Sequence, residues 1–392
     1  MLHFELIISR LISISLLILS NPIVILVNLI IAPFEFLNNT RYIKRAKLKL
    51  NKINAIKIGI TGSYGKTSCK NILTAMLSTK YKVLKTDKSR NTPMGIYLTT
   101  NELTGDEEVF IAEMGARRCG DIKKLCDIVN PQYGIITGIG NQHLGEFGSL
   151  GKIIKAKCEL IDMMPPNGFM VFNGDDKKTK SLKTRFHGES QTVSINSEEG
   201  IYAKNIKLST NGLSFDIFGF ETTISVSTKL LGRHNVLNIL MCTVLAHKLG
   251  IGLEEIKSAI SNLNPTHHRL ELLKNTGEIT IIDDSYNANI DGSLFALEVL
   301  KLFKGRKIVF SQGIIELGII NKRVNQELGM MIAKSADLII LTGPNSSALL
   351  KGIDSAGFSG KILKFGDFKE TTKALKSILK PGDVLLVQND IP

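Results

Sequence analysis

The sequence predicts an α/β protein with a mostly parallel central domain, a smaller doubly wound domain after it, and a transmembrane helix ahead of both. Three observations support this prediction. From residue 56 onward, short apolar runs alternate with helical stretches, which is typical of parallel strands joined by crossover helices. A glycine-rich stretch follows the first apolar run, and a long uncharged segment lies near the N-terminus. The 392 residues are enough for two or three domains.

The N-terminal segment "LISISLLILSNPIVILVNLIIAP", residues 11 to 33, contains no charge. It exceeds the roughly 20 residues that a helix needs to cross a bilayer, so we expect a membrane helix. The pair Asn21 and Pro22 leaves a kinked single span and a re-entrant hairpin both open.

Seven basic residues and no acidic ones follow between residues 41 and 57. A basic flank beside a span favours the cytoplasmic side of a membrane, so this arrangement accounts for the net charge of +13 without a nucleic-acid partner. We expect residues 1–55 to be a membrane anchor and basic linker, and the later domains to face the cytoplasm at the cell membrane. The five cysteines form no C-x-x-C pair, which argues against a zinc site or a disulfide framework.

The first α/β series occupies residues 56–265. Apolar runs predict strands that end in polar residues, and ligands of open α/β sheets bind at these carboxyl ends. The expected strands are 56–61, 109–114 and 133–137, and the expected helices are 66–77, 121–129 and 150–163. Antiparallel strands are expected within residues 190–229. The stretch "GRHNVLNILMCTVLAHKLG" that follows is expected to be helical.

A second α/β series occupies residues 266–392 and predicts a smaller Rossmann-like domain. Pro265 disfavours a continuing helix, so "NLNPTHH", residues 262–268, is the expected hinge. The expected strands are 279–284, 306–311, 337–343 and 383–388, and the expected helices are 292–303 and 321–334. The polar ending "VQNDIP" suggests that this domain is truncated.

The stretch "GITGSYGKTS", residues 59–68, lacks the spacing of the common phosphate-binding loop, because Ile60 stands where that pattern has its first glycine. A strand, a short glycine loop and a helix still place backbone N–H groups, a helix N-terminus and an ammonium group around an anion. We therefore expect Lys66 to reach nucleotide phosphates and the Thr67 hydroxyl to bind Mg²⁺. The loop residues expected to contact the nucleotide are Gly62, Ser63, Gly65, Lys66, Thr67 and Ser68.

Two further residues follow the next two strands: Glu113 in "IAEMGAR" and His143 in "TGIGNQHLGEFGS". Each alone could be a surface or capping residue. Together, at neighbouring strand ends beside a phosphate loop, they have the chemistry of metal ligands. Lys157 lies on an expected helix, and on physical grounds alone it reads as a solvated lysine.

Seven motifs occur in an order that resembles the Mur ligases, the ATP-dependent amide-forming enzymes of cell-wall peptide assembly. The motifs are "GSYGKTS", "IAEMGARRCGDI", "NPQYGIITGIGNQHLGEFGSLGKIIKAKCEL", "NGDD", "LLGRHNVLNIL", "HRLEL" and "IIDDSYNAN", within about residues 56 to 345. The "DDSYNAN" and "IELG" pieces most resemble the members that add D-alanyl-D-alanine to a muramoyl-tripeptide nucleotide.

This resemblance implies a role for each matching residue. Lys66 and Thr67 would hold ATP and Mg²⁺, with Glu113 and His143 as further ligands of the metal. Lys157 would be carried as a carbamate that supports the metal, so that Lys66, His143 and Lys157 form the catalytic set. The remaining matches are Asn235 and Asn238 for adenine, and Arg269 and Asp284, which would close over phosphate and ribose.

The resemblance also implies a reaction. A peptide carboxylate would attack the γ-phosphate of ATP, and an amino acid or dipeptide amine would then displace phosphate from the acyl phosphate. Typical members begin with a domain that binds a uridine nucleotide, whereas only about 55 residues precede the ATP domain here, so a small-molecule and a lipid-linked acceptor both stay open. Two local departures are Gly138, where asparagine is usual, and Ile290, where proline is usual.

Three other functions remain possible at this point: a pseudomurein or capsule-type peptide ligase, a folylpolyglutamate synthase, and a membrane scaffold that binds ATP and recruits other cell-wall enzymes. The scaffold is disfavoured because a protein that only binds ATP has no need of Lys66, Glu113, His143 and Lys157 together.

Overall fold

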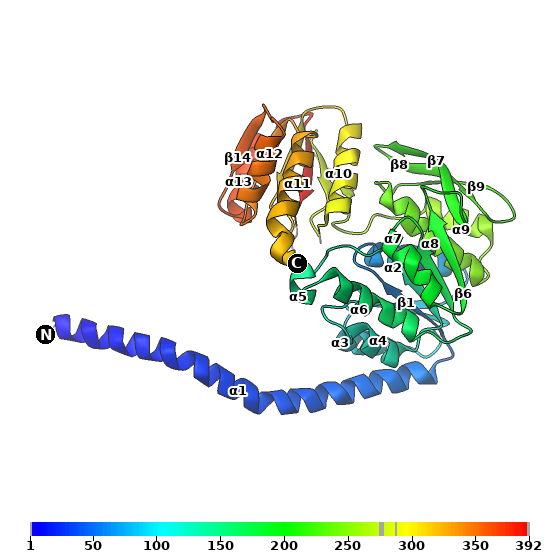
Figure 1. The fold of residues 1–392 in the computed structure, drawn as a ribbon, viewed down its shortest axis with the longest axis horizontal. Helices are drawn as coiled ribbons and strands as arrows, with labels where there is room; N and C mark the ends of the chain where they lie inside the picture. The colour runs from blue at the N-terminus through cyan, green and yellow to red at the C-terminus, as the bar shows by residue number, and fades with distance from the viewer. Residues whose placement is uncertain (1, 274–277, 287, 390–392) are drawn as a thin grey trace.

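The computed structural model describes residues 2–273, 278–286 and 288–389, with the side chains of 2–21, 23 and 36 outside the description. Its polypeptide forms two sheets, each covered by helices on both faces, and a long N-terminal helix that extends away from them (Figure 1). The expected α/β class with mostly parallel sheets is confirmed.

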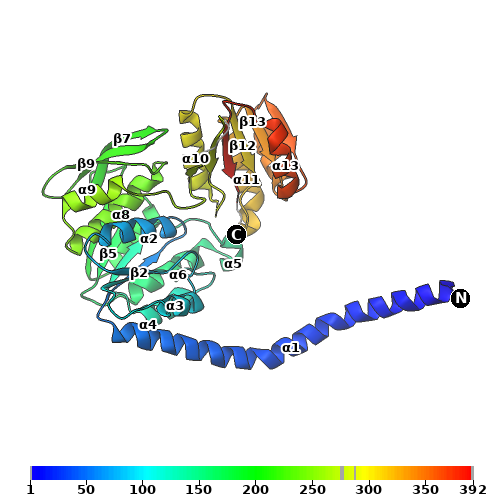
Figure 2. The ribbon, with the colours of Figure 1, turned by 180° about the vertical axis from the view of Figure 1, so that it is seen from behind.

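The N-terminal helix α1 runs from Leu2 to Lys52 without interruption, so the re-entrant hairpin is not observed. Pro22 and Pro33 lie inside it, and the helix is visibly bent in both views (Figures 1 and 2), as expected where proline removes a backbone hydrogen bond.

The prediction of a membrane-spanning segment is wrong. Within the residues whose side chains the structure describes, no helix is both long enough and apolar enough to cross a bilayer. Residues 11–21 of the proposed span lie outside the described side chains. The expected location at the cell membrane was inferred from this segment, so that prediction is wrong as well.

The basic stretch after residue 41 is also not a linker. It is the C-terminal part of α1 and packs against the central domain, where Ala46 and Leu50 are fully buried. These two residues are four apart and share one face of the helix, while Lys49 Nζ donates to the carbonyl oxygen of Thr100 at 3.2 Å. The lysines and arginines from Arg41 to Lys52 therefore occupy the exposed faces of a docked helix, whereas Lys57 is buried in β1.

The first sheet has nine strands in the order β2-β3-β1-β4-β5-β6-β7-β8-β9, parallel up to β7 and antiparallel from there to β9. The antiparallel edge expected within residues 190–229 is confirmed. The strands are β1 Ile56–Thr61, β2 Val83–Lys85, β3 Val109–Glu113, β4 Tyr133–Ile136, β5 Phe169–Asn173, β6 Glu189–Ser194, β7 Ile201–Ser209, β8 Gly212–Phe218 and β9 Ile224–Thr228.

Helices cover both faces of this sheet. On one face α2, α8 and α9 pack against apolar strand residues such as Ile58 and Val109, and on the other α1, α3, α4 and α6 pack against residues such as Phe110 and Phe172. The helices are α2 Lys66–Leu77, α3 Pro93–Thr100, α4 Asp121–Val129, α5 Leu144–Phe147, α6 Leu150–Asp162, α7 Lys177–Leu182, η1 Lys183–Arg185, α8 His234–Lys248 and α9 Leu253–Ser261.

The second sheet has six strands in the order β10-β11-β15-β12-β13-β14, all parallel except β10. Helices α10, α11 and α12 cover one face and α13 covers the other. The strands are β10 Glu271–Leu273, β11 Thr280–Asp283, β12 Lys307–Ser311, β13 Leu338–Leu341, β14 Lys361–Lys364 and β15 Val384–Gln388. The helices are α10 Ile290–Leu302, η2 Gly318–Ile320, α11 Asn321–Ala333, α12 Ser346–Ser355 and α13 Phe368–Ile378. The last residues of "VQNDIP", 390–392, lie outside the description, so the suggested truncation is not tested by it.

Candidate active site

The glycine loop connects β1 to α2 at the carboxyl edge of the first sheet. Gly62 and Gly65 have positive φ angles of 152° and 78°, and a Cβ at Gly62 would stand 2.0 Å from the hydroxyl oxygen of Thr137. Both positions therefore require glycine. No side chain caps the N-terminus of α2 and its first turn contains no acidic residue, which leaves its N–H groups available to an anion.

Lys66 begins α2 and folds back over the loop. Its Nζ donates to the carbonyl oxygens of Gly62 at 2.8 Å and Ser63 at 3.1 Å. Burial lowers the pKa of Lys66 to about 8. The negative charge of Glu113 acts to raise this pKa, and the positive charge of Arg269 acts to lower it further. An anion in the loop would reverse this effect, since it would favour the charged ammonium.

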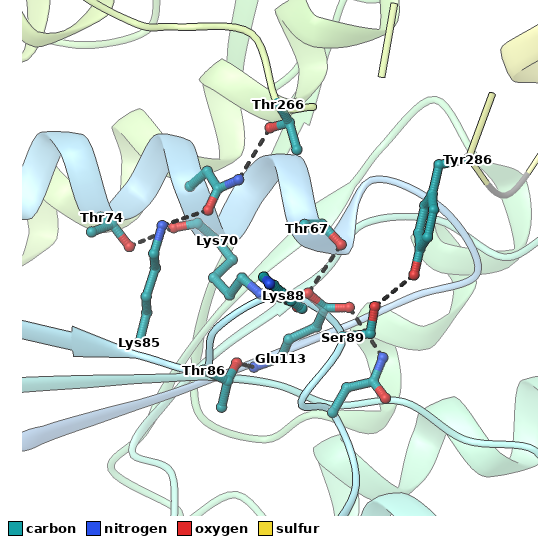
Figure 3. A network of polar contacts seen from close by, with 12 residues as sticks. Thr67, Lys70, Thr74, Lys85, Thr86, Lys88, Ser89, Glu113, Thr266 and Tyr286 are labelled. Atoms are coloured by element: carbon teal, nitrogen blue, oxygen red, sulfur yellow. Dashed lines mark hydrogen bonds and ion pairs between the residues drawn. The ribbon is translucent and has the colours of Figure 1, made fainter. Parts of the chain in front are cut away.

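Glu113, at the end of β3, lies at the centre of a buried polar network (Figure 3). Its Oε2 accepts hydrogen bonds from the Thr67 hydroxyl at 3.0 Å and from Lys70 Nζ at 2.9 Å, and its Oε1 accepts from Asn91 at 3.2 Å. Burial acts to raise the pKa of Glu113, but the charges of Lys70 and Lys66 outweigh it and hold the pKa below its usual value. The carboxylate is thus kept ionised beside the Thr67 hydroxyl.

His143 and Lys157 come to the same region from the chain that follows β4. His143 precedes α5 in a left-handed conformation with φ of 58°, and its Nδ1 lies 2.5 Å from Oε2 of Glu316 in the second domain. Burial lowers the pKa of His143 despite that carboxylate. Lys157, on α6, is only 3% exposed; burial and the nearby charge of Lys66 lower its pKa to about 7. The solvated reading of Lys157 is therefore wrong.

A cavity of about 550 Å³ lies between the two domains and brings most of the expected residues together. Its lining combines the glycine loop, Glu113 at the end of β3, and His143 from the segment that follows β4. The second domain contributes Arg269, Tyr286, Ile315 and Glu316. The expected site residues that line it are Gly62, Ser63, Gly65, Lys66, Thr67, Glu113, His143, Lys157 and Arg269.

A second cavity of about 350 Å³ adjoins α2 and residues 262–266 of the expected hinge. Three of the expected nucleotide-binding residues line it, namely Ser68, Asn235 and Arg269, and Arg269 lines both cavities. Figure 3 shows Thr266 of the hinge above α2; its hydroxyl accepts a hydrogen bond from Asn71 of α2 at 3.1 Å. Arg269 therefore lies where the two cavities adjoin.

Two expected residues line neither cavity. Asn238 is buried beneath the loop: a Cβ on Gly65 would stand 2.9 Å from the Oδ1 atom of Asn238. Its Nδ2 donates a hydrogen bond to Oδ1 of Asn235 at 3.0 Å. It can orient Asn235 but does not face the cavity. Asp284 accepts the backbone N–H of Leu270 at 3.2 Å, and burial raises its pKa to about 6.

Sequence reasoning missed four residues of this region: Tyr64, Lys70, Tyr286 and Glu316. For Lys70 a signal existed, because a lysine one turn after Lys66 falls on the face of α2 that carries Leu73 and Leu77. A charge on a buried face indicates a buried partner. The partners of the other three could not be read from spacing, since they come from distant segments.

The fold and this site define a class of protein. Residues 60–246 match the family model of the Mur ligase middle domain, and residues 268–388 match that of the Mur ligase glutamate ligase domain. The chain belongs to the Mur ligase family, and it is an ATP-dependent peptide ligase. The interpretation as a scaffold that binds ATP without ligating is thereby set aside.

Particular members of the family are similar over most of the chain. The UDP-N-acetylmuramoyl-tripeptide–D-alanyl-D-alanine ligases of Synechocystis and Bacillus subtilis are 30% and 28% identical to it, over 84% and 87% of this chain and 70% and 74% of theirs. The crystal structure of MurF from Thermotoga maritima in complex with ADP superposes with a TM-score of 0.80 at 27% identity, covering 90% of this chain and 80% of that one. A MurF structure from Acinetobacter baumannii gives 0.81 at 25% identity, covering 90% and 77%.

Proposed function

We propose that this enzyme joins D-alanyl-D-alanine to the terminal carboxylate of a muramoyl-tripeptide nucleotide in the synthesis of peptidoglycan precursors. The similarity to ligases named for this reaction, over at least 70% of their length, is the observation that carries the proposal. The two adjoining cavities support it, because a ligase must hold ATP and two further substrates at one place.

The reaction proceeds in two steps. A carboxylate oxygen of the tripeptide attacks the γ-phosphorus of ATP, which forms an acyl phosphate and releases ADP. The amine of the dipeptide then attacks the acyl carbon, the amide bond forms, and phosphate leaves with that carboxylate oxygen and a proton is released. In the first step two anions approach each other, so Lys66 and the N-terminus of α2 stabilise the charge on the transferring phosphoryl group.

The residues around the loop fit a magnesium ion. Oxygen ligands suit Mg²⁺, and the Thr67 hydroxyl and the ionised Glu113 carboxylate already lie 3.0 Å apart, with His143 in the same cavity. When bound, the ion would neutralise phosphate charge and orient the γ-phosphate. Thr67, Glu113 and His143 are its proposed ligands.

Lys157 fits the role of a carbamate. Only a neutral amine adds to CO₂, and a pKa of about 7 leaves much of this buried amine neutral at physiological pH. The addition forms an N–C bond, releases a proton and turns the side chain into an anion. An anion there would balance the charges of Lys66 and the metal.

The nucleotide is proposed to lie across Arg269. The base occupies the smaller cavity, where Asn235 offers its amide and Asn238 holds that amide in place. Arg269 binds phosphate oxygens between the two cavities, and Asp284 contacts the ribose as the domains close.

The experiment combines purified protein, Mg-ATP, UDP-muramoyl-tripeptide and D-alanyl-D-alanine, and detects the amide by mass spectrometry. With ¹⁸O in the tripeptide carboxylate, one label is expected in the phosphate released. Lys66→Ala should abolish the product. Lys80→Ala should not, because Lys80 is an exposed lysine beyond the C-terminal end of α2 that donates to the Gly250 carbonyl. Absence of the amide would contradict the proposed substrates. Formation of the amide without ¹⁸O transfer would contradict the proposed acyl-phosphate intermediate. Formation of a different amide in a screen of pseudomurein-type or lipid-linked acceptors would assign the ligase to the alternative class.

A further inference from the structure

Glu316 brings a carboxylate of the second domain to the imidazole of His143. It belongs to the segment that joins β12 to η2, far along the chain from the loop that carries His143. Glu316 Oε2 lies 2.5 Å from His143 Nδ1, and the carbonyl oxygen of Glu316 accepts the backbone N–H of Gly145 at 2.9 Å. Glu316 therefore binds the same short loop through both its side chain and its backbone.

The backbone on both sides is shaped for this contact. His143 and Glu316 both have left-handed conformations, with φ of 58° and 60°, which non-glycine residues adopt only where the surroundings demand it. Gly145 and Gly318 face each other, and a Cβ at Gly318 would stand 3.0 Å from Gly145 Cα. The two strained residues and the two glycines together allow the carboxylate to meet the imidazole.

The contact determines which nitrogen of His143 carries the proton. A carboxylate only accepts hydrogen bonds, so Nδ1 must be protonated, and in a neutral imidazole Nε2 then keeps its lone pair. Among the hydrogen bonds of the described residues none involves Nε2 of His143. A histidine that binds a metal commonly donates its other N–H to a carboxylate, which fixes the ring and the tautomer.

A nearby carboxylate provides a natural comparison. Ligand atoms of His143, Glu146 and Glu316 lie within 4.8 Å of one another, but Glu146 pairs with the exposed Arg117 at 2.7 Å. Glu146 lies in α5, which His143 directly precedes, whereas Glu316 comes from the other domain. The carboxylates of Glu146 and Glu316 thus lie near the same imidazole and carry the same charge, but only that of Glu316 is seen to bond its Nδ1 among the described residues.

We propose that Glu316 is a positioning residue contributed by the second domain: it accepts the Nδ1 proton of His143 and presents Nε2 to the metal that the proposed reaction needs. The inference rests on the proposed role of His143 as a magnesium ligand. The metal site would then be complete only when the two domains are in contact, because the second domain supplies the partner that orients His143.

The first test requires no substrate. The full chain is labelled with ¹⁵N-histidine, and imidazole nitrogen spectra are recorded at pH 8, with His143→Gln used to assign the His143 signals. In the unmodified protein we expect protonated Nδ1 and unprotonated Nε2. In Glu316→Ala we expect a mixture of the two tautomers, in Glu316→Gln an intermediate result because the amide oxygen can still accept, and in Glu146→Ala no change.

The second test measures ligation against Mg²⁺ concentration. Glu316→Ala should raise the half-saturating Mg²⁺ concentration about 10- to 100-fold, Glu316→Gln less, and Glu146→Ala less than about twofold. An unchanged tautomer in Glu316→Ala, an equal change in Glu146→Ala, or an unchanged Mg²⁺ requirement would overturn the inference. If the expected amide is absent, the Mg²⁺ dependence of ATP hydrolysis replaces it, so the substrate assignment can fail while Glu316 is still tested.

Discussion

The ring of Tyr64 lies against the backbone of Gly138, and a Cβ at position 138 would stand 2.5 Å from Tyr64 Cζ. Tyr64 belongs to the glycine loop and Gly138 to the segment that leads from β4 to His143. The Thr137 hydroxyl also donates to the carbonyl oxygen of Tyr64. Tyr64 thus fills the space that a side chain at position 138 would need.

Gly138→Ala should consequently destabilise the protein and displace the loop. Overpacking of this kind costs about 1–3 kcal/mol, and we expect that loss in urea denaturation together with weaker ATP binding in calorimetry. The double variant Tyr64→Ala/Gly138→Ala removes the clash and should bind ATP more tightly than Gly138→Ala alone. Equal ATP affinity in Gly138→Ala and the unmodified protein would contradict the argument.

The ion pair of Lys70 and Glu113 predicts a second effect. These side chains are 1% and 3% exposed and lie 2.9 Å apart. Lys70→Met leaves a buried carboxylate without its nearest cation, which should lower the free energy of unfolding by about 3–5 kcal/mol at neutral pH. The exposed pair of Lys82 and Asp106 is the control, and Lys82→Met should cost less than about 1 kcal/mol.

The pH dependence of this effect has a definite sign. The pKa of Glu113 is held below its usual value, so its contribution to stability is present above the pKa of the unfolded chain and is lost as pH falls through the lower folded value. In Lys70→Met the carboxyl should protonate at a higher pH, which relieves the uncompensated charge. The stability difference from the unmodified protein should therefore shrink on acidification; a difference that grew instead would exclude the ion pair as its origin.

Periodic apolar patterns allowed much of the fold to be predicted. The helix from Lys66 to Leu77 and the strand from Ile56 to Thr61 begin and end where the sequence indicates, because buried parallel strands and amphipathic helices leave a clear pattern. The short strands β2 and β14 and the helices α12 and α13 were not anticipated. In β14, "KILK", the apolar signal is too short to be distinguished from a loop.

The N-terminus shows where composition misleads. Hydropathy and charge favoured a span and a linker, yet Ala46 and Leu50 turn the basic stretch into a docked helix. At the site, the strand ends placed Glu113 and His143 near the loop, because parallel strands share one carboxyl edge. The contact of His143 with Glu316 depends on how two domains meet, which no local pattern encodes.

Lys157 predicts a chemical signature that depends on pH. With ¹³C-bicarbonate at pH 8 we expect a carbamate resonance in carbon NMR, because burial and Lys66 lower the pKa of this amine to about 7 and leave most of it neutral. Below about pH 7 the unmodified amine takes up a proton, so the signal should disappear. Lys157→Met should lack the signal at every pH, and Lys155→Met, which removes an exposed lysine on the same helix, should retain it. A signal that survives in Lys157→Met would assign the carbamate elsewhere.

Tyr286 makes two separable interactions, one with Ser89 in the segment between β2 and α3 of the first domain and one with Arg269. Its hydroxyl lies 2.6 Å from Ser89 Oγ, a contact visible in Figure 3, and its ring lies under Arg269 with 4.7 Å between the guanidinium carbon and the ring centroid. Tyr286→Phe removes only the hydrogen bond, which is worth about 0.5–1.5 kcal/mol. Tyr286→Ala also removes the cation–π contact, worth about 0.5–1 kcal/mol at an exposed site.

These values predict an ordered series in kcat/KM for ATP. Tyr286→Phe should lower it about 2- to 10-fold and Tyr286→Ala further still, because the ring holds Arg269 between the two cavities. Tyr202→Phe, whose ring stacks on Phe218 at the antiparallel edge of the first sheet, should leave it unchanged. If Tyr286→Phe and Tyr286→Ala lost the same activity, the ring would not orient Arg269, and the hydrogen bond to Ser89 alone would connect the domains.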